Sequence, residues 1–158
     1  MPLQVRRVVT GHDAQGRAIV EIDDVLSGAE RRPKTSAAVI WTTEGFPVDN
    51  TGKQDEGLRE VGTTHANGTV FRVLQLEPGN AQRMHRTDSI DYAVIMSGEI
   101  DMELEPGDFV HLKAGDVLVQ RGTIHNWVNN GSEACTIAFV LIDAKPVEVN
   151  GKVLHAQG

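Results

Sequence analysis

From residue 69 onward, short apolar runs alternate with turn signals. This spacing constrains the fold more than any other feature of the chain. A long β-favouring run ends at Pro78-Gly79, and two later runs flank the hairpin signal Glu105-Pro106-Gly107-Asp108. Strands that recur about every 8–12 residues are typical of a sandwich or barrel, so we expect an all-β fold with at most a few helical turns. The predicted strands are Thr69–Glu77, Asp91–Met96, Ile100–Leu104, Phe109–Leu112, Val117–Gln120, Ile124–Val128 and Ala134–Ile142.

The first 65 residues carry sparser strand signals. Val5–Thr10 and Arg17–Ile22 flank a turn, Ala37–Thr43 is β-branched, and residues 49–67 read as a loop with one short helical turn. No internal repeat and no domain boundary interrupts the chain. We expect residues 1–65 to form an N-terminal β extension that packs on a barrel or across a dimer. Residues 66–145 would then form the barrel, and residues 146–158 a C-terminal tail.

The net charge of the chain limits the classes of partner that it is expected to bind. The 158 residues carry a formal net charge of −7, which gives no broad attraction for phosphate backbones or anionic lipid. We therefore expect no nucleic-acid and no membrane partner. The start lacks the apolar core of a signal peptide, no apolar stretch approaches the length of a membrane span, and the single cysteine, Cys135, allows no intrachain disulfide. These features favour a cytoplasmic location.

Two spaced sets of polar residues and glycines carry the chemistry. The first runs from Gly79 over five residues to His85, then to Thr87, Asp91 and, six residues on, Gly98. The second set contains Gly115 and Gly122, then His125 after two residues and Asn129 after three more.

These sets resemble the two signature motifs of the cupin superfamily, which read G-x5-H-x-H-x3,4-E-x6-G and G-x5-P-x-G-x2-H-x3-N. The resemblance implies a double-stranded β-helix, or jelly-roll, barrel. It places His85, Asp91 and His125 at metal-ligand positions. Thr87 stands where the motif has a second histidine, Asp91 stands where it has glutamate, and the second motif lacks its proline. We therefore expect one divalent transition metal (Fe, Mn, Ni or Zn), bound weakly because Thr87 replaces a ligand.

The alternation of side chains along a strand also indicates that His85, Asp91 and His125 lie together. Alternate residues face one side, so His85 and Thr87 point the same way, as does Arg83 if the strand begins early enough. A barrel can aim these side chains, Asp91 and His125 at one point, and two imidazoles with one carboxylate suit a divalent metal with open positions. Two alternatives remain: a metal-free ligand pocket, and polar residues that only satisfy one another by hydrogen bonds.

Other residues are candidates for the pocket wall. An inward arginine could pair with a substrate carboxylate or phosphate, and Arg83, Arg86 and Arg121 lie close to the motifs. Gln120 could orient a ligand, and Thr87 could hydrogen-bond a metal-bound water. Tyr92 and Trp127 either line the pocket or pack in the wall.

Two functions follow from these features. The first is a metal-dependent enzyme that acts on a small organic molecule in the barrel, and the resemblance does not choose among dioxygenase, decarboxylase, isomerase and lyase. The second is a non-catalytic module that binds or senses a small molecule. We also expect a homodimer, because small cupins commonly pair through N-terminal segments and an open sheet edge invites pairing.

Overall fold

The fold is built almost entirely from antiparallel strands. The computed structural model describes residues 1–158, and its one helical segment is the single 3-10 turn η1 (Glu56–Leu58). The strands are β1 (Gln4–His12), β2 (Ala18–Ser27), β3 (Ala29–Arg32), β4 (Thr35–Glu44), β5 (Gly68–Leu76), β6 (Ser89–Ser97), β7 (Glu99–Glu103), β8 (Phe109–Lys113), β9 (Val117–Arg121), β10 (Asn126–Val128), β11 (Cys135–Asp143), β12 (Val147–Val149) and β13 (Lys152–Leu154). No helix is long and apolar enough to cross a membrane.

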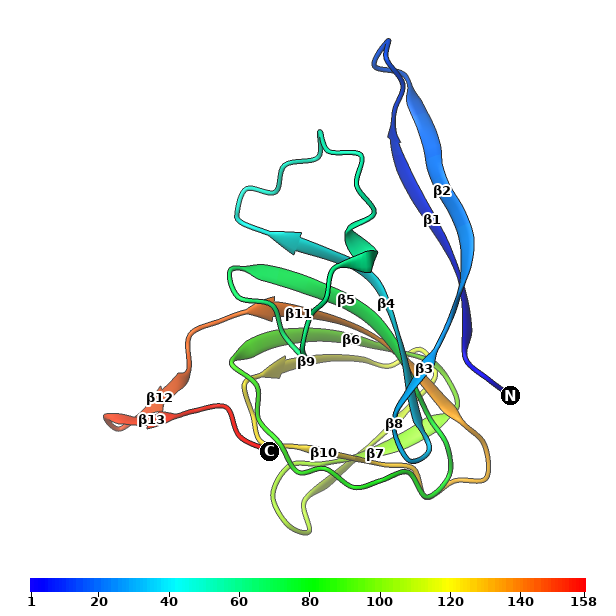
Figure 1. Ribbon diagram of the computed structural model, residues 1–158. Coiled ribbons are helices and arrows are strands. Elements are labelled where there is room, and N and C mark those ends of the chain that lie inside the picture. Colours follow the sequence, from blue (N-terminus) through cyan, green and yellow to red (C-terminus); the bar gives the residue numbers. More distant parts are fainter.

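Two sheets form the barrel. The larger has the order β3-β4-β5-β11-β6-β9, and the smaller has the order β10-β7-β8. In Figure 1 the smaller sheet lies below the larger one, and the chain crosses between them several times. The sheets face each other without continuous pairing around the barrel. The predicted all-β jelly-roll fold is confirmed.

The core lies between these two sheets. Alternation along β6 turns Asp91, Ala93 and Ile95 inward, whereas Tyr92 and Val94 are exposed. A cluster of 12 buried residues fills the interior, with Ile137 from the larger sheet among its fully buried members. The same alternation therefore decides which polar side chains enter the barrel.

The backbone geometry explains why position 98 of the motif is glycine. It joins β6 to β7 with φ of 74°, in the left-handed region that other residues rarely adopt. A Cβ added there would lie 2.5 Å from the carbonyl oxygen of Ala134. Only glycine permits the turn and this close approach to the start of β11.

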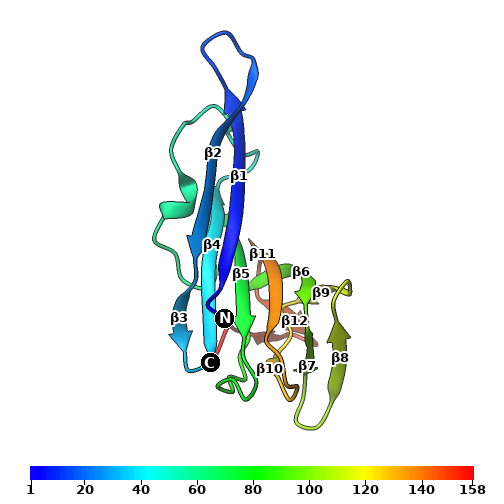
Figure 2. The same cartoon turned by 90° about the vertical axis from the view of Figure 1, so that its right-hand side faces the viewer.

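The first four strands extend the larger sheet and cover its outer face. β4 pairs with β5, and β3 pairs with β4 at the edge. The β1–β2 hairpin packs along the outside of β4, on the side away from β7 and β8 (Figure 2). A second apolar cluster joins them, formed by Leu3, Ala38, Ile40 and Val73. The barrel wall therefore includes strands that lie outside the motif region.

Three short strands were not predicted. β3 consists of Ala-Glu-Arg-Arg, and β12 and β13 are only three residues each. Such polar or short segments lack an apolar period, so pairing with a neighbouring strand makes them β rather than their own sequence.

Arg7 holds the hairpin to the barrel. Its guanidinium, with 3% of the side chain exposed, donates to Asp24 of β2 at 3.0 and 2.7 Å and to Asp55 at 2.8 Å twice. It also donates to the carbonyl oxygen of Ile40 in β4 at 3.2 Å. One buried cation thus joins the hairpin, β4 and the loop before η1.

Replacing Arg7 by methionine should lower the free energy of unfolding by about 2–3 kcal/mol, because two carboxylates and a carbonyl lose their donor. Arg6→Met is the matched control, because Arg6 pairs with Asp23 on the exposed face of the same hairpin. Urea denaturation of both variants measures the difference. Equal losses in the two variants would contradict this account of Arg7.

The same cluster should give a pH dependence. The hydrogen bonds from Arg7 hold the pKa of Asp55 below its ordinary value. A depressed folded-state pKa gives stability that is present above about pH 3.9 and is lost as pH falls through the lowered pKa. Denaturation between pH 2 and 6 should therefore show a smaller acid loss for Arg7→Met than for the wild-type chain. An identical acid profile would be the opposing result.

Candidate functional site

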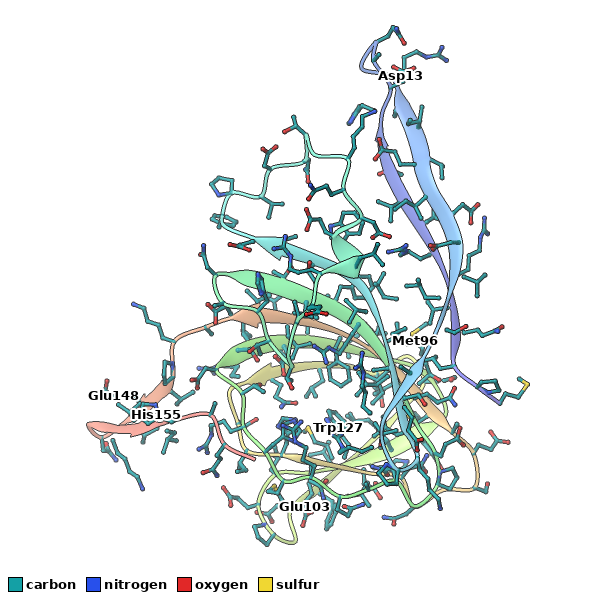
Figure 3. All side chains as sticks on the ribbon, viewed as in Figure 1. Asp13, Met96, Glu103, Trp127, Glu148 and His155 are labelled. Atoms are coloured by element: carbon teal, nitrogen blue, oxygen red, sulfur yellow. The ribbon has the colours of Figure 1, made fainter.

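A cavity of about 300 Å³ lies inside the barrel. Its wall combines apolar side chains of β4, β5 and β11 with polar side chains from β3, β6 and the segments that precede β6 and β10. Trp127 of β10 lies between the two sheets in Figure 3 and closes one side. A wider hollow of about 800 Å³ lies beside the β1–β2 hairpin and contains none of the motif residues.

His85 and His125 form the centre of the cavity wall. Their main chains pair as an isolated antiparallel bridge, in which each N–H donates to the other residue's carbonyl oxygen at 2.9 Å. The two ring centroids are consequently 4.1 Å apart, with 53° between the ring planes. The backbone therefore brings together two imidazoles that are forty positions apart in the chain.

Main-chain carbonyls orient both rings. Nδ1 of His85 lies 3.0 Å from the carbonyl oxygen of Arg83, and Nδ1 of His125 lies 3.0 Å from that of Thr123. Donation by each Nδ1–H leaves Nε2 as the acceptor, the arrangement that suits an imidazole for receiving a proton or binding a metal.

Gln120 lies against His125. Its buried side-chain amide nitrogen contacts both ring nitrogens and donates to Nε2 at 2.9 Å. The amide oxygen of Gln120 has no hydrogen-bond partner. Gln120 therefore restrains His125, whereas Nε2 of His85 has no partner within the protein.

Burial keeps both rings neutral. Desolvation, together with the adjacent His85, lowers the pKa of His125 to about 4. The pKa of His85 is also lowered, chiefly by burial and secondarily by the nearby Arg83. Neutral imidazoles retain the lone pairs that catalysis or ligation requires.

Asp91 supplies a carboxylate to the same cavity. It is 4% exposed and accepts a hydrogen bond from Ser89 at 2.6 Å, while Ser89 and Thr87 are joined at 2.8 Å. Burial raises the pKa of Asp91. In the 158 residues described, no three His, Cys, Asp or Glu side chains form a group that could hold a metal ion. The donors therefore match the kinds that a divalent metal prefers, but in this arrangement they are not gathered around one point.

Comparison with known proteins assigns this chain to a family. The cupin-domain model matches residues 72–142. Phomopsin biosynthesis cluster protein C' of Diaporthe leptostromiformis is 38% identical over 157 residues, which cover 94% of this chain and 83% of that protein. The chain belongs to the cupin family. The cupin-domain-containing oxidoreductase fogC of Aspergillus ruber is 35% identical, over 96% of this chain and 79% of its own length.

A solved structure agrees on the fold. KdgF from Halomonas sp. superposes with a TM-score of 0.50 at 15% identity, over 73% of this cupin and 86% of that chain. At this identity the likeness concerns the jelly-roll fold alone.

The cavity of this cupin contains most of the predicted pocket residues. Arg83, Thr87 and Trp127 line it, and Gln120 lies behind His125. The prediction for Tyr92 is wrong: its side chain is on the outer face with half of its surface exposed. Because Asp91 faces inward, its neighbour on the same strand faces outward.

Two other motif arginines also lie elsewhere. Arg86 donates to the carbonyl oxygen of Gly122 at 3.1 Å and is absent from the cavity wall, and Arg121 is exposed.

Sequence reasoning missed five polar residues of the wall: Arg31, Arg32, Thr35, Thr63 and Arg72. Arg72 carried a usable signal, because it occupies an inward position within the apolar run of β5. Arg31 and Arg32 carried none, because β3 was not predicted as a strand.

Proposed function

We propose that this cupin is an enzyme that transforms a small organic molecule inside its barrel. The observation that carries the proposal is the pair of buried, neutral imidazoles, with ring centroids 4.1 Å apart, that opens with Asp91 onto a cavity of about 300 Å³. Concave sites of this size with a few convergent polar groups are typical of small-molecule sites. Relatives that carry the name cupin-domain-containing oxidoreductase favour oxidoreductase chemistry.

The three groups have separate roles in this proposal. Nε2 of His85 has no protein partner and is the first acceptor available to a substrate proton. Asp91, whose pKa is raised by burial, holds or returns a proton and is hydrogen-bonded to Ser89, which in turn is hydrogen-bonded to Thr87. Gln120 positions His125.

A divalent transition metal is the finer part of the proposal. His85, Asp91 and His125 would hold it in place of the proton-transfer roles described above, and the metal would supply Lewis-acid or redox chemistry to the substrate. Ligation by Nε2 of His125 requires the amide nitrogen of Gln120 to give up its contact with that atom. Thr87 would remain a neutral hydroxyl beside the ligands, which favours weak binding.

A non-catalytic binding module is the alternative. The contact between Gln120 and His125 favours it, because an amide that already satisfies Nε2 makes the wall a hydrogen-bonding surface. Metal content separates the two proposals.

Protein purified without chelators and then supplied with Mn²⁺ should bind close to one ion per chain, measured by elemental analysis. His85→Ala and His125→Ala should each lose this metal while remaining folded, because the core consists of aliphatic and aromatic side chains. His111→Ala is the matched control, since His111 is exposed and bonded to Asp101 outside the cavity. A metal-free wild-type chain that fails to take up added Mn²⁺ would favour the binding module.

Thr87→His should tighten metal binding, because an imidazole at this position adds a fourth ligand to the cavity wall. Competition with a chromophoric chelator measures the dissociation constant for Zn²⁺. We expect it to fall by at least about tenfold, in line with the effect of altering a metal's ligand environment. An unchanged or weaker affinity would argue against a metal at these residues.

We also propose that this cupin forms a homodimer. Its edge strand β9 exposes Val117 and Val119 by 74% and 57%, in register with the exposed Val94 and Tyr92 of β6. An apolar, unpaired edge invites association.

Sedimentation velocity at micromolar concentration should give the mass of two chains. The double variant Val117→Lys/Val119→Lys should sediment as one chain, whereas Phe109→Lys on β8 of the smaller sheet should leave the dimer intact. A monomeric wild-type chain, or a dimer that survives the double change, would contradict this proposal.

A further inference from the structure

The cavity wall contains an excess of positive charge. Four arginines line it, Arg31, Arg32, Arg72 and Arg83, while Asp91 is its only acidic residue. This excess occurs in a chain whose formal net charge is −7. The charge of the cavity is therefore opposite to that of the protein.

None of these four arginines forms an ion pair, whereas the arginines of the N-terminal half that lie outside the cavity often do. Arg6 pairs with Asp23, Arg7 with Asp24 and Asp55, and Arg59 with Glu44 and Glu56. In the cavity, Arg72 donates only to the carbonyl oxygens of Gly62 and Thr63. Arg83 donates to that of Gly158.

Several donors in the wall lack any partner. Nε of Arg32, Nε of Arg72 and the hydroxyl of Thr35 are all buried without a hydrogen bond, and Thr35 is only 1% exposed. A buried donor without a partner has lost its hydration without a hydrogen bond to replace it. Proteins tolerate such a cost most often where a ligand completes the set.

The strand register brings two of these orphaned donors together. Arg32 pairs with Thr35 across the β3–β4 turn, and Thr35 pairs in turn with Leu76 of β5. His85 and His125 line the same cavity as Arg32 and Thr35. A group bound by Arg32 and Thr35 would therefore share the cavity with the imidazole pair.

The charges in the wall repel one another. Burial lowers the pKa of Arg72 to about 10, with a further contribution from Arg31. Burial and Arg83 lower the pKa of Arg32. An anion among these groups would relieve both the desolvation and the repulsion.

Apolar side chains form a further part of the wall. Leu74 and Leu76 on β5 face the same side as Arg72, and Phe139 of β11 is in register with Arg72. Such a surface suits a hydrocarbon or aromatic body better than a polyhydroxylated one.

We propose that the cavity binds an organic carboxylate, with Arg32 and Thr35 holding the carboxylate and the Leu74, Leu76 and Phe139 wall holding an apolar body. This inference rests on the proposed function, because it names the substrate class of the same cavity. Arg72 adds charge along the wall. His85 and His125 then face the part of the ligand next to its carboxylate.

Benzoate and the full chain test this proposal. Calorimetric titration should show saturable binding of benzoate, and benzamide, which has the same ring without the charge, should bind at least about tenfold more weakly. Arg32→Gln should weaken benzoate by a similar factor, and Thr35→Val by a few fold. Arg121→Gln, an exposed arginine outside the cavity, is the control and should bind as the wild type does.

Three results would overturn the proposal: equal affinity for benzamide and benzoate, unchanged benzoate affinity in Arg32→Gln, or tighter binding of phenyl phosphate than of benzoate. The last would assign the arginines to a phosphate. Should Arg32→Gln fail to fold, the ratio of benzoate to benzamide affinity in the wild-type chain decides. Because binding is measured without turnover, the two proposals can fail separately. A wild-type chain that binds benzoate but transforms no carboxylate contradicts only the proposed function, and an active chain that does not distinguish benzoate from benzamide contradicts only this inference.

Discussion

The register of three central strands, β5, β11 and β6, is the constraint on which the barrel and its site both depend. β11 pairs with β5 on one side and β6 on the other, so that Phe139 lies between Arg72 and Ala93, and Leu141 lies between Val70 and Asp91. The side-chain period of a strand is two, and a slip of one residue would turn each inward set outward. The same hydrogen bonds that bury the apolar core thus also decide that Asp91 and Arg72 face the cavity. The hydrogen-bond register of β5, β11 and β6 therefore determines both the packing of the core and the set of polar side chains in the cavity.

The N-terminal strands add further polar and charged side chains to the cavity wall. β3 and β4 add Arg32 and Thr35 to a wall that the motif strands would otherwise complete with imidazoles and a carboxylate. Arg7 fastens the hairpin that covers the outer side of β4. The barrel region therefore contributes the imidazoles, the carboxylate, Arg72 and Arg83, and the extension contributes Arg31 and Arg32.

Local signals in the sequence predicted the all-β fold well. Turn residues with strong conformational demands marked most strand ends, and alternation placed His85 and Asp91 on inward faces. The same alternation, applied from Asp91 to Tyr92, would have excluded Tyr92 from the pocket. Arg32 was beyond such reasoning, because β3 is a strand only through its pairing with β4, and the partner of a polar edge segment is a tertiary property. The contact between Gln120 and His125 depends on side-chain conformation and was likewise not encoded in the spacing.

The bridge between His85 and His125 has a mechanical consequence. His85 lies on the segment that leads into β6 of the six-stranded sheet, and His125 leads into β10 of the three-stranded sheet. Any ligand that touched both imidazoles would be a non-covalent cross-link between the two halves of the barrel. Its binding energy would then oppose separation of the sheets as well as its own dissociation, so that occupancy of the cavity and closure of the barrel would be thermodynamically linked. The two imidazoles would then join the two sheets most strongly when a ligand occupies the cavity.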